Sequence, residues 1–500
     1  MVLEYLSATR FWSQMGSRSL SSEFRDEMVT GTSEQTKLFL AAKEQYTRLV
    51  QCEKKCLWFE QNRASSTVHL PNARWQRLIT LHLILLYEHE RFFLMCQHPS
   101  ANPSIRDLPE KYAMPGRMWR YGIRSLLDIL QQNLPQTLGY IIFFIETVSS
   151  ILKQLVLTNS ALGDSLFEQL GDLALYRAVV EKSDRKDWEA IPRYWYQKAA
   201  DRNPDSGQLQ HRLAACSRSD PLKALFYLTK ALISVQPFPH SRVTVGRFFD
   251  RWDTLALQHN TMATSFIAAH YVLLTGDPDG QFMTLANGFL SLLPSYIQKY
   301  DYKGQHIVYI MSCNFASVLR YGELAFTTVV FPQSESGRTH HANKSGQADG
   351  IYLTFETLSV LLRYSGSHDT VPGIHICLAF LCISVHRPFM ENLGTTVPWR
   401  AITRFLNGLF TPDAAFLKIE EESFPIGDDG AAPWLPEDYL ICGQVWSQSY
   451  YPTLFFKDGL WYGVSNDEVE TRRHRCLWLG VRIAMVSLQA FGCSWFGTMD

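Results

Sequence analysis

The chain has 500 residues, of which 46% are hydrophobic and 19% are charged. This length exceeds what one hydrophobic core usually serves, and the composition supplies ample apolar material with too little charge for a disordered chain. The formal net charge is -1. The whole chain therefore has no strong field that would attract a polyanion, and nucleic-acid binding would depend on a local basic patch.

The ten cysteines are scattered and indicate neither a metal site nor a disulfide framework. They lack the short paired spacings of zinc ligands and the density of a small secreted domain. Cys52 and Cys56 lie one helical turn apart, but no nearby Cys or His completes a ligand set. We interpret the cysteines as buried thiols of a protein in a reducing compartment, and we expect no metal and no cofactor.

Two apolar stretches predict buried core helices, so no membrane partner is expected. Residues 138–157 carry Glu146 and Lys153 in their interior, and residues 374–385 are followed at once by His386 and Arg387. A membrane span needs about 20 apolar residues with few or no charges.

Apolar residues at steps of three and four predict helices in the first half of the chain. Residues 1–31 are polar and predict a flexible lead-in, after which Thr32 offers an N-cap for a helix over 34–60. A second helix is expected over 73–96, ending before a His-Pro step. Further helices are expected at 117–132, 137–158, 164–181, 190–202, 207–216 and 221–236.

The second half continues the helical pattern, with one interruption. Residues 332–350, PQSESGRTHHANKSGQADG, lack large apolar side chains and predict an exposed loop. Helices are then expected at 351–365, 372–386, 398–410 and 470–492. We therefore predict an all-α protein, with a flexible segment at 1–31, one helical domain at 32–240 and a second at 241–500.

Residues 194–239 carry small side chains where close helix pairs need them. Ala199, Ala224 and Ala231 allow two antiparallel helices to approach, and the Asn203-Pro204 step ends one helix before the next begins. Any helical hairpin would share some of these features. The pattern as a whole resembles a tetratricopeptide unit.

Further segments extend this resemblance to a family. They are LGDLALYR at 170–177, VPWRAITRFLNGLF at 397–410, LPEDYLICG at 435–443 and RRHRCLWLGVRIA at 472–484. Together they resemble the family of the ever-shorter-telomeres protein and its relatives in nonsense-mediated mRNA decay, in particular its short fungal members. The resemblance implies a 14-3-3-like tetratricopeptide domain followed by a helical-hairpin domain. It also implies a protein or phosphoprotein partner and a location in the nucleus or cytoplasm.

The 14-3-3 pattern implies a phosphopeptide groove, in which two basic residues seven apart on one helix join an Arg-Tyr pair on another. Decay-factor relatives read Gly-Asp-x-x-Arg-Tyr-Arg, whereas this chain has Leu175 in place of the phosphate-gripping Arg. His82 and His89 keep the spacing of seven, but neutral histidine binds phosphate poorly at pH 7, so we expect hydrogen-bonded groove residues there. The groove candidates are His82, His89, Arg74, Arg77, Leu175, Tyr176 and Arg177.

A basic and aromatic segment suggests an alternative function, binding of telomerase RNA or single-stranded telomeric DNA. Its candidates are Lys111, Arg117, Trp119, Arg120 and Arg124, which mix positive charge with a stackable ring. The same pattern is also typical of a solvated helix face. A second basic run lies at 472–475.

No Gly-rich phosphate loop, nucleophile elbow or metal-spaced histidine pair occurs in the sequence. We therefore expect a non-enzymatic adaptor that binds a protein segment in a helical groove, with nucleic-acid binding as the alternative.

Overall fold

The computed structural model describes residues 33–63, 72–158, 163–181, 185–256, 261–277, 280–299, 304–323, 343–384, 396–411, 419–425, 434–452, 455–456 and 468–491. Across these ranges the chain is all-helical and has no strand. It forms two compact units, unit 1 at residues 1–195 and unit 2 at residues 196–500.

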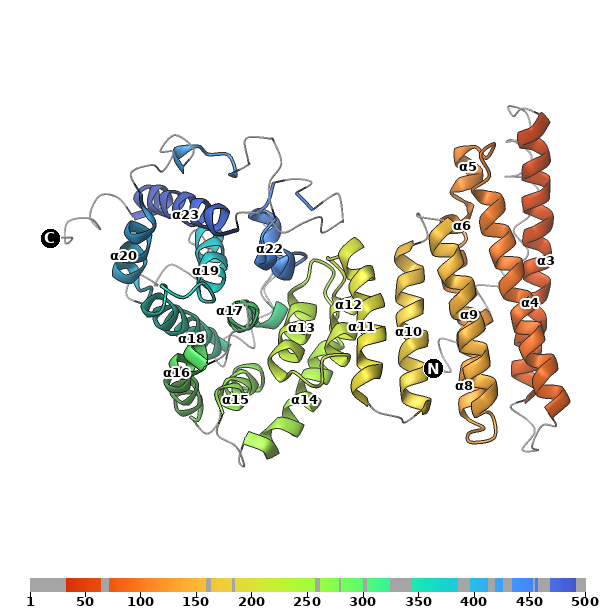
Figure 1. Ribbon diagram of the computed structural model, residues 1–500, viewed down its shortest axis with the longest axis horizontal. Coiled ribbons are helices and arrows are strands. Elements are labelled where there is room, and N and C mark those ends of the chain that lie inside the picture. Colours follow the sequence, from red (N-terminus) through yellow and green to blue (C-terminus); the bar gives the residue numbers. More distant parts are fainter. Residues whose placement is uncertain are drawn as a thin grey trace, which may run out of the picture. The chain divides into compact units, whose positions relative to one another are not determined.

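Unit 1 is a row of helices that stand side by side, from α3 to α10 in Figure 1. Its elements are α3 (Ser33–Arg63), α4 (Asn72–Cys96), α5 (Pro103–Arg106), α6 (Leu108–Lys111), α7 (Met114–Arg117), the π-helix η2 (Met118–Arg124), α8 (Ser125–Gln131), α9 (Leu138–Thr158) and α10 (Gly163–Glu181). The next helix, α11 (Arg185–Arg202), continues across the boundary between the units.

The core of unit 1 follows from the heptad spacing of α4. Ile79, Leu86 and Phe93 lie seven residues apart and are all buried, as residues on one face of a helix should be when that face meets a core. The adjoining π-helix approaches α4 at a glycine. A Cβ atom on Gly122 would lie 2.9 Å from Cδ2 of Leu86, so the small residue permits the close contact.

Unit 2 is built around α13, eleven of whose thirteen residues are buried. The described elements are α12 (Gly207–Ala215), α13 (Pro221–Ile233), α14 (Ser241–Ala256), α15 (Met262–Thr275), α16 (Phe282–Lys299), α17 (Gln305–Val318), η4 (Arg320–Gly322), α18 (Asn343–Arg363), α19 (Val371–Ser384), α20 (Trp399–Leu409), α22 (Pro436–Ile441), η7 (Ser447–Ser449) and α23 (Glu468–Phe491). Helix α13 packs against α12, α14 and α17. A helix that is buried on nearly all sides belongs in the interior of a large unit.

Three connecting segments of unit 2 are joined by backbone hydrogen bonds. Val235 N donates to the carbonyl of Gly443, and Gln236 N donates to the carbonyl of Asp205, each over 3.0 Å. Gly443 has a φ of +81°, and a Cβ atom there would lie 2.0 Å from the carbonyl oxygen of Pro204. Only glycine fits both the backbone conformation and the space.

The all-α prediction is confirmed, and most expected helices appear within a few residues of their predicted bounds. The segment predicted as one helix at 117–132 instead consists of the end of α7, the π-helix η2 and α8. The expected loop at 332–350 is wrong over its last part, because α18 begins at Asn343. Gly350 packs there against Ser317 of α17, with Oγ 2.7 Å from the position of a Cβ atom, so small residues serve close helix packing.

The division between units falls after Trp195, whereas the sequence suggested a boundary near residue 240. The difference arises because α12 and α13 pack with α14 and α17, so this helix pair belongs to the second unit. The predicted lead-in at 1–31 and the first part of the predicted loop, 332–342, lie outside the described residues.

Candidate peptide-binding cleft

Unit 1 has an open cleft of about 680 Å³ where the first turns of α4 and α9 lie side by side. Its apolar wall includes the buried Ile79 and the exposed Phe143, and its rim is polar. The lining residues are Asn72, Gln76, Ile79, Thr80, Leu83, Gln136, Gly139, Tyr140 and Phe143. An apolar wall with a few amides and hydroxyls is the usual composition of a binding site for a ligand or a protein segment.

Beyond the cleft, the exposed face of α4 carries further apolar side chains toward the end of that helix. Thr80, Tyr87 and Leu94 lie seven residues apart, and all three are exposed, with Tyr87 at 49% and Leu94 at 47%. Such spacing places side chains on one straight line of a helix. Large apolar side chains on that line offer anchors at the spacing that a partner helix uses.

A basic line runs beside this apolar one. Arg77, Ile84 and Arg91 are also seven residues apart and exposed, and Arg74 precedes them by one turn. Within the described residues, none of these three arginines makes an ion pair or a hydrogen bond. The face of α4 therefore combines apolar anchors with positive charges that are free to meet a partner.

An ion pair lies one turn beyond Phe143 on α9. Arg177 Nη1 of α10 lies 3.0 Å from Oε1 of Glu146, and its Nε lies 3.1 Å from Oε1 of Glu181. Arg177 is thereby held by two carboxylates. The neighbouring Tyr176 donates a hydrogen bond of 2.8 Å to Asp128 of α8, and Leu175 is half-buried.

The two histidines of the predicted groove are inside the core, so their expected place in a groove is wrong. His82 is 1% exposed and its Nδ1 lies 3.0 Å from the carbonyl oxygen of Gly122. His89 is fully buried, with Nε2 3.7 Å from Oε1 of Glu53. Burial lowers the pKa of His82 to about 4 and also lowers the pKa of His89. Neither ring can reach or charge-pair with a bound phosphate.

The seven predicted groove residues consequently fall into three environments. Arg74 and Arg77 are exposed on α4, and the histidines lie on the buried face of that same helix. Leu175, Tyr176 and Arg177 lie on α10, where Tyr176 contacts Asp128 of α8 and Arg177 contacts Glu146 of α9. Sequence reasoning missed Phe143 and Tyr140, because it treated α9 as a wholly buried core helix.

The nucleic-acid candidates do not form one exposed patch either. Arg117 is 6% exposed and its Nε donates to Oε1 of Glu53 over 3.1 Å, so this predicted contact to nucleic acid is wrong. Arg124 Nε lies 3.6 Å from Oδ2 of Asp128, and Trp119 packs partly against the core. Lys111 and Arg120 are exposed.

The basic run at 472–475 is also largely internal to unit 2. Arg472 Nη2 donates to Oε2 of Glu437 over 2.9 Å, and Arg475 pairs with Asp438. His375 completes this cluster, with Nδ1 3.0 Å from Oε1 of Glu437. These charges are buried, and they connect α19, α22 and α23.

Among the described residues, no group of three or more metal-ligating side chains is arranged to hold a metal ion. One described helix, Leu138–Thr158, is long and apolar enough to cross a membrane by length and composition. Seven of its residues, including Phe144 and Leu152, are buried in unit 1.

A comparison with protein-family models gives no match, and a comparison with curated proteins gives no significant match.

Proposed function

We propose that the chain is a non-enzymatic helical adaptor that binds a segment of a partner protein along α4 and in the cleft between α4 and α9. The observation that carries this proposal is the combination, on one surface, of an open cleft of about 680 Å³, exposed apolar side chains and arginines that make no ion pair within the described part of the chain. An adaptor is also what the resemblance to telomerase-associated and mRNA-decay factors implies.

The surface favours an amphipathic partner helix with acidic flanks. Tyr87, Leu94 and Ile84 supply apolar contacts at helical spacing, the arrangement used when a helix lies in a groove. Arg77 and Arg91 are fourteen residues apart, which is about 21 Å along the helix axis. Acidic residues at a similar separation on the partner would pair with both.

The same surface argues against nucleic acid as the first choice. Ile84 separates Arg77 from Arg91, and the line next to them is Thr80, Tyr87 and Leu94, so the positive charge is not continuous. Single-strand binders instead combine a continuous basic track with stacking rings.

The test is a selection of random peptides of about 16 residues, long enough to span both arginines as a helix, on the immobilised full chain. Enriched peptides should carry apolar residues at helical spacing with Asp or Glu at the flanks, and should lose binding to Phe143→Ala and to Arg77→Glu. Val179→Ala serves as the matched control, because Val179 is similarly exposed (59% against 54% for Phe143) on α10 and does not line the cleft. Peptides that bind Phe143→Ala and Arg77→Glu as tightly as the unmodified chain would refute the proposal. A single-stranded oligonucleotide that competes for the site more tightly than these peptides would refute it as well.

A further inference from the structure

Lys230 is a buried cation of α13 without an ion-pair partner among the described residues. The residue is 4% exposed, and its Nζ donates a hydrogen bond of 2.8 Å to the carbonyl oxygen of Leu440. Buried charges in proteins are normally paired with an opposite charge, because desolvation of a lone ammonium is costly. Within the described residues, Lys230 departs from this rule.

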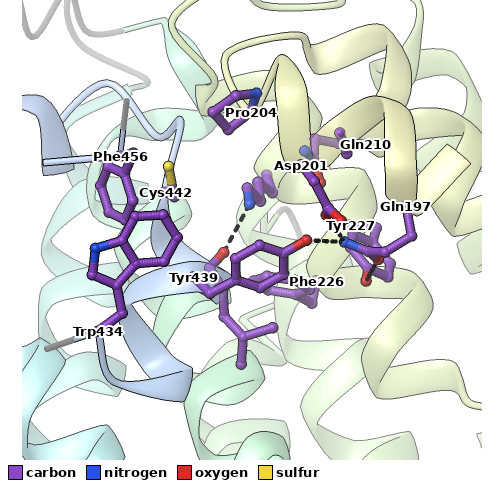
Figure 2. Close-up of a pocket in the computed structure, with 13 residues that line it drawn as sticks. Gln197, Asp201, Pro204, Gln210, Phe226, Tyr227, Trp434, Tyr439, Cys442 and Phe456 are labelled. Carbon is purple, nitrogen blue, oxygen red and sulfur yellow. Dashed lines mark hydrogen bonds between the residues drawn. The ribbon is translucent and has the colours of Figure 1, made fainter. Parts of the chain in front are cut away.

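It faces a pocket of unit 2 with a polar floor and an aromatic rim. Figure 2 shows Trp434 and Phe456 together at one side of this pocket, with ring centroids 5.3 Å apart, and Tyr439 beside them. The remaining space has room for about two water molecules, since about 30 Å³ is open to the centres of such molecules. Gln210, which is 2% exposed, also lines the pocket, and its Oε1 has no hydrogen-bond partner.

The neighbouring charges favour an uncharged ligand over an anionic one. Asp201 lines the pocket and Asp205 lies near Lys230, and burial raises the pKa of both carboxyl groups. An anionic ligand would be repelled by these carboxylates when they are ionised. Burial also lowers the pKa of Lys230 to about 8, which favours the neutral amine. A neutral amine in a largely apolar pocket is a nucleophile toward carbonyl carbon.

We propose that Lys230 is an attachment site for aromatic aldehydes or ketones, which it binds as an imine in the pocket rimmed by Trp434, Tyr439 and Phe456. The carbonyl group enters the open space of about 30 Å³, and the ring of the ligand lies against the aromatic rim.

The step involves no change in oxidation state. The lone pair of Nζ attacks the carbonyl carbon, the C=O π electrons move to the oxygen, and this oxygen gains a proton as the nitrogen loses one. The carbinolamine then expels water as the C=N bond forms, so one amine and one carbonyl compound give one imine and one water. Asp201, whose Oδ1 accepts a hydrogen bond of 3.0 Å from Gln197, lines the same pocket, and we assign the proton transfer to its carboxyl group.

The experiment uses benzaldehyde and sodium cyanoborohydride, which reduces an imine to a stable amine, on the full folded chain at pH 7.5. Mass spectrometry of peptides then gives the labelling rate of each lysine. Lys230 should react at least about tenfold faster than the exposed Lys198 and Lys299, because its lowered pKa of about 8 leaves a substantial share of its amine neutral and nucleophilic at this pH. The preference should vanish in urea, where the pocket is lost.

Two comparisons test the role of the pocket. Trp434→Ala keeps the amine and should slow labelling of Lys230 severalfold. The preference for Lys230 over Lys198 should be smaller with butanal, which has no ring, than with benzaldehyde. Labelling of Lys230 no faster than that of Lys198, or equal rates with and without urea, would overturn the proposal. Equal rates for Trp434→Ala and the unmodified chain would overturn the assignment of aromatic ligands.

Discussion

Arg117 Nε donates a hydrogen bond of 3.1 Å to Oε1 of Glu53, and both side chains are buried where α3 meets α7 in unit 1. Tyr46 adds its hydroxyl oxygen as an acceptor for Arg117 Nη1 at 3.0 Å. Burial raises the pKa of Glu53, but the hydrogen bonds and the positive charge of Arg117 outweigh burial and hold this pKa below its ordinary value. A charge that the sequence suggested for nucleic acid is thus neutralised inside the protein.

Removal of one partner of this pair should strongly destabilise unit 1. Arg117→Met leaves Glu53 buried without its countercharge, and loss of one partner of a buried pair typically costs about 3–5 kcal/mol. Urea unfolding, followed by hydrogen exchange of α3 and α4 peptides, measures the loss. The double variant Glu53→Gln with Arg117→Met should recover part of it, because no lone charge then remains. A double variant less stable than Arg117→Met alone would contradict this reading.

The helices could be predicted from the sequence, whereas the environment of their charged residues could not. Apolar periodicity is a local signal, and it correctly predicted α4 and α9. Whether Arg117 or His82 meets solvent depends on α3 and η2, which approach from 64 and 40 residues away. The helical start at Asn343 was missed because Gly and Ser resemble loop residues until a partner helix is known to pack on them.

The candidate cleft was anticipated only in part. Arg74 and Arg77 were predicted as residues of a phosphopeptide groove, whereas Phe143 was assigned to a core because apolar composition alone does not distinguish the buried and exposed sides of α9. The pocket at Lys230 was not foreseen. It forms where α13 meets α22, some 200 residues further along the chain, and sequence spacing carries no sign of that contact.

The burial of His82 predicts a loss of stability as the pH falls. Its pKa is about 4 in the folded chain and about 6.5 when unfolded, so between these values the unfolded state binds more protons. The contribution of the neutral His82 to the free energy of unfolding is complete above pH 6.5 and diminishes as the pH falls toward 4. At pH 5 the loss should be about 2 kcal/mol. Urea unfolding at pH 7 and pH 5 gives the free energy of unfolding of the unmodified chain and of His82→Gln. This free energy should differ less between the two pH values in the variant. An equal difference in both proteins would count against the burial of this ring.

Gly443 should tolerate no side chain. Gly443→Ala would place a Cβ atom 2.0 Å from the carbonyl oxygen of Pro204 at a φ of +81°, so the three joined segments of unit 2 must separate. A loss of several kcal/mol is expected, since backbone strain and a broken contact combine. The matched control is Gly246→Ala within α14, where no atom lies within 4 Å of the added Cβ atom and helix propensity predicts a gain of about 0.5–1 kcal/mol. The unfolding temperatures of the two variants should therefore shift in opposite directions from that of the unmodified chain. A shift in the same direction would show that the contact with Pro204 is not what constrains Gly443.

Binding of an acidic peptide to the proposed surface should depend on Arg77 and Arg91 and hardly on pH between 7.5 and 6.0. Both arginines are exposed, and guanidinium groups in general carry their charge throughout this range, whereas the buried His82, with a pKa of about 4, stays neutral. Arg77→Glu and Arg91→Glu should each lower the affinity for a selected peptide about tenfold in dilute buffer. Added salt should reduce this loss of affinity because exposed charges are screened. Arg363→Glu provides the control, since it reverses an exposed charge on α18 of unit 2. Fluorescence anisotropy with a labelled peptide at both pH values gives the affinities. An affinity that rises severalfold on acidification to pH 6.0 would point to histidine as the charge donor, and would contradict the placement of His82 and His89 in the core.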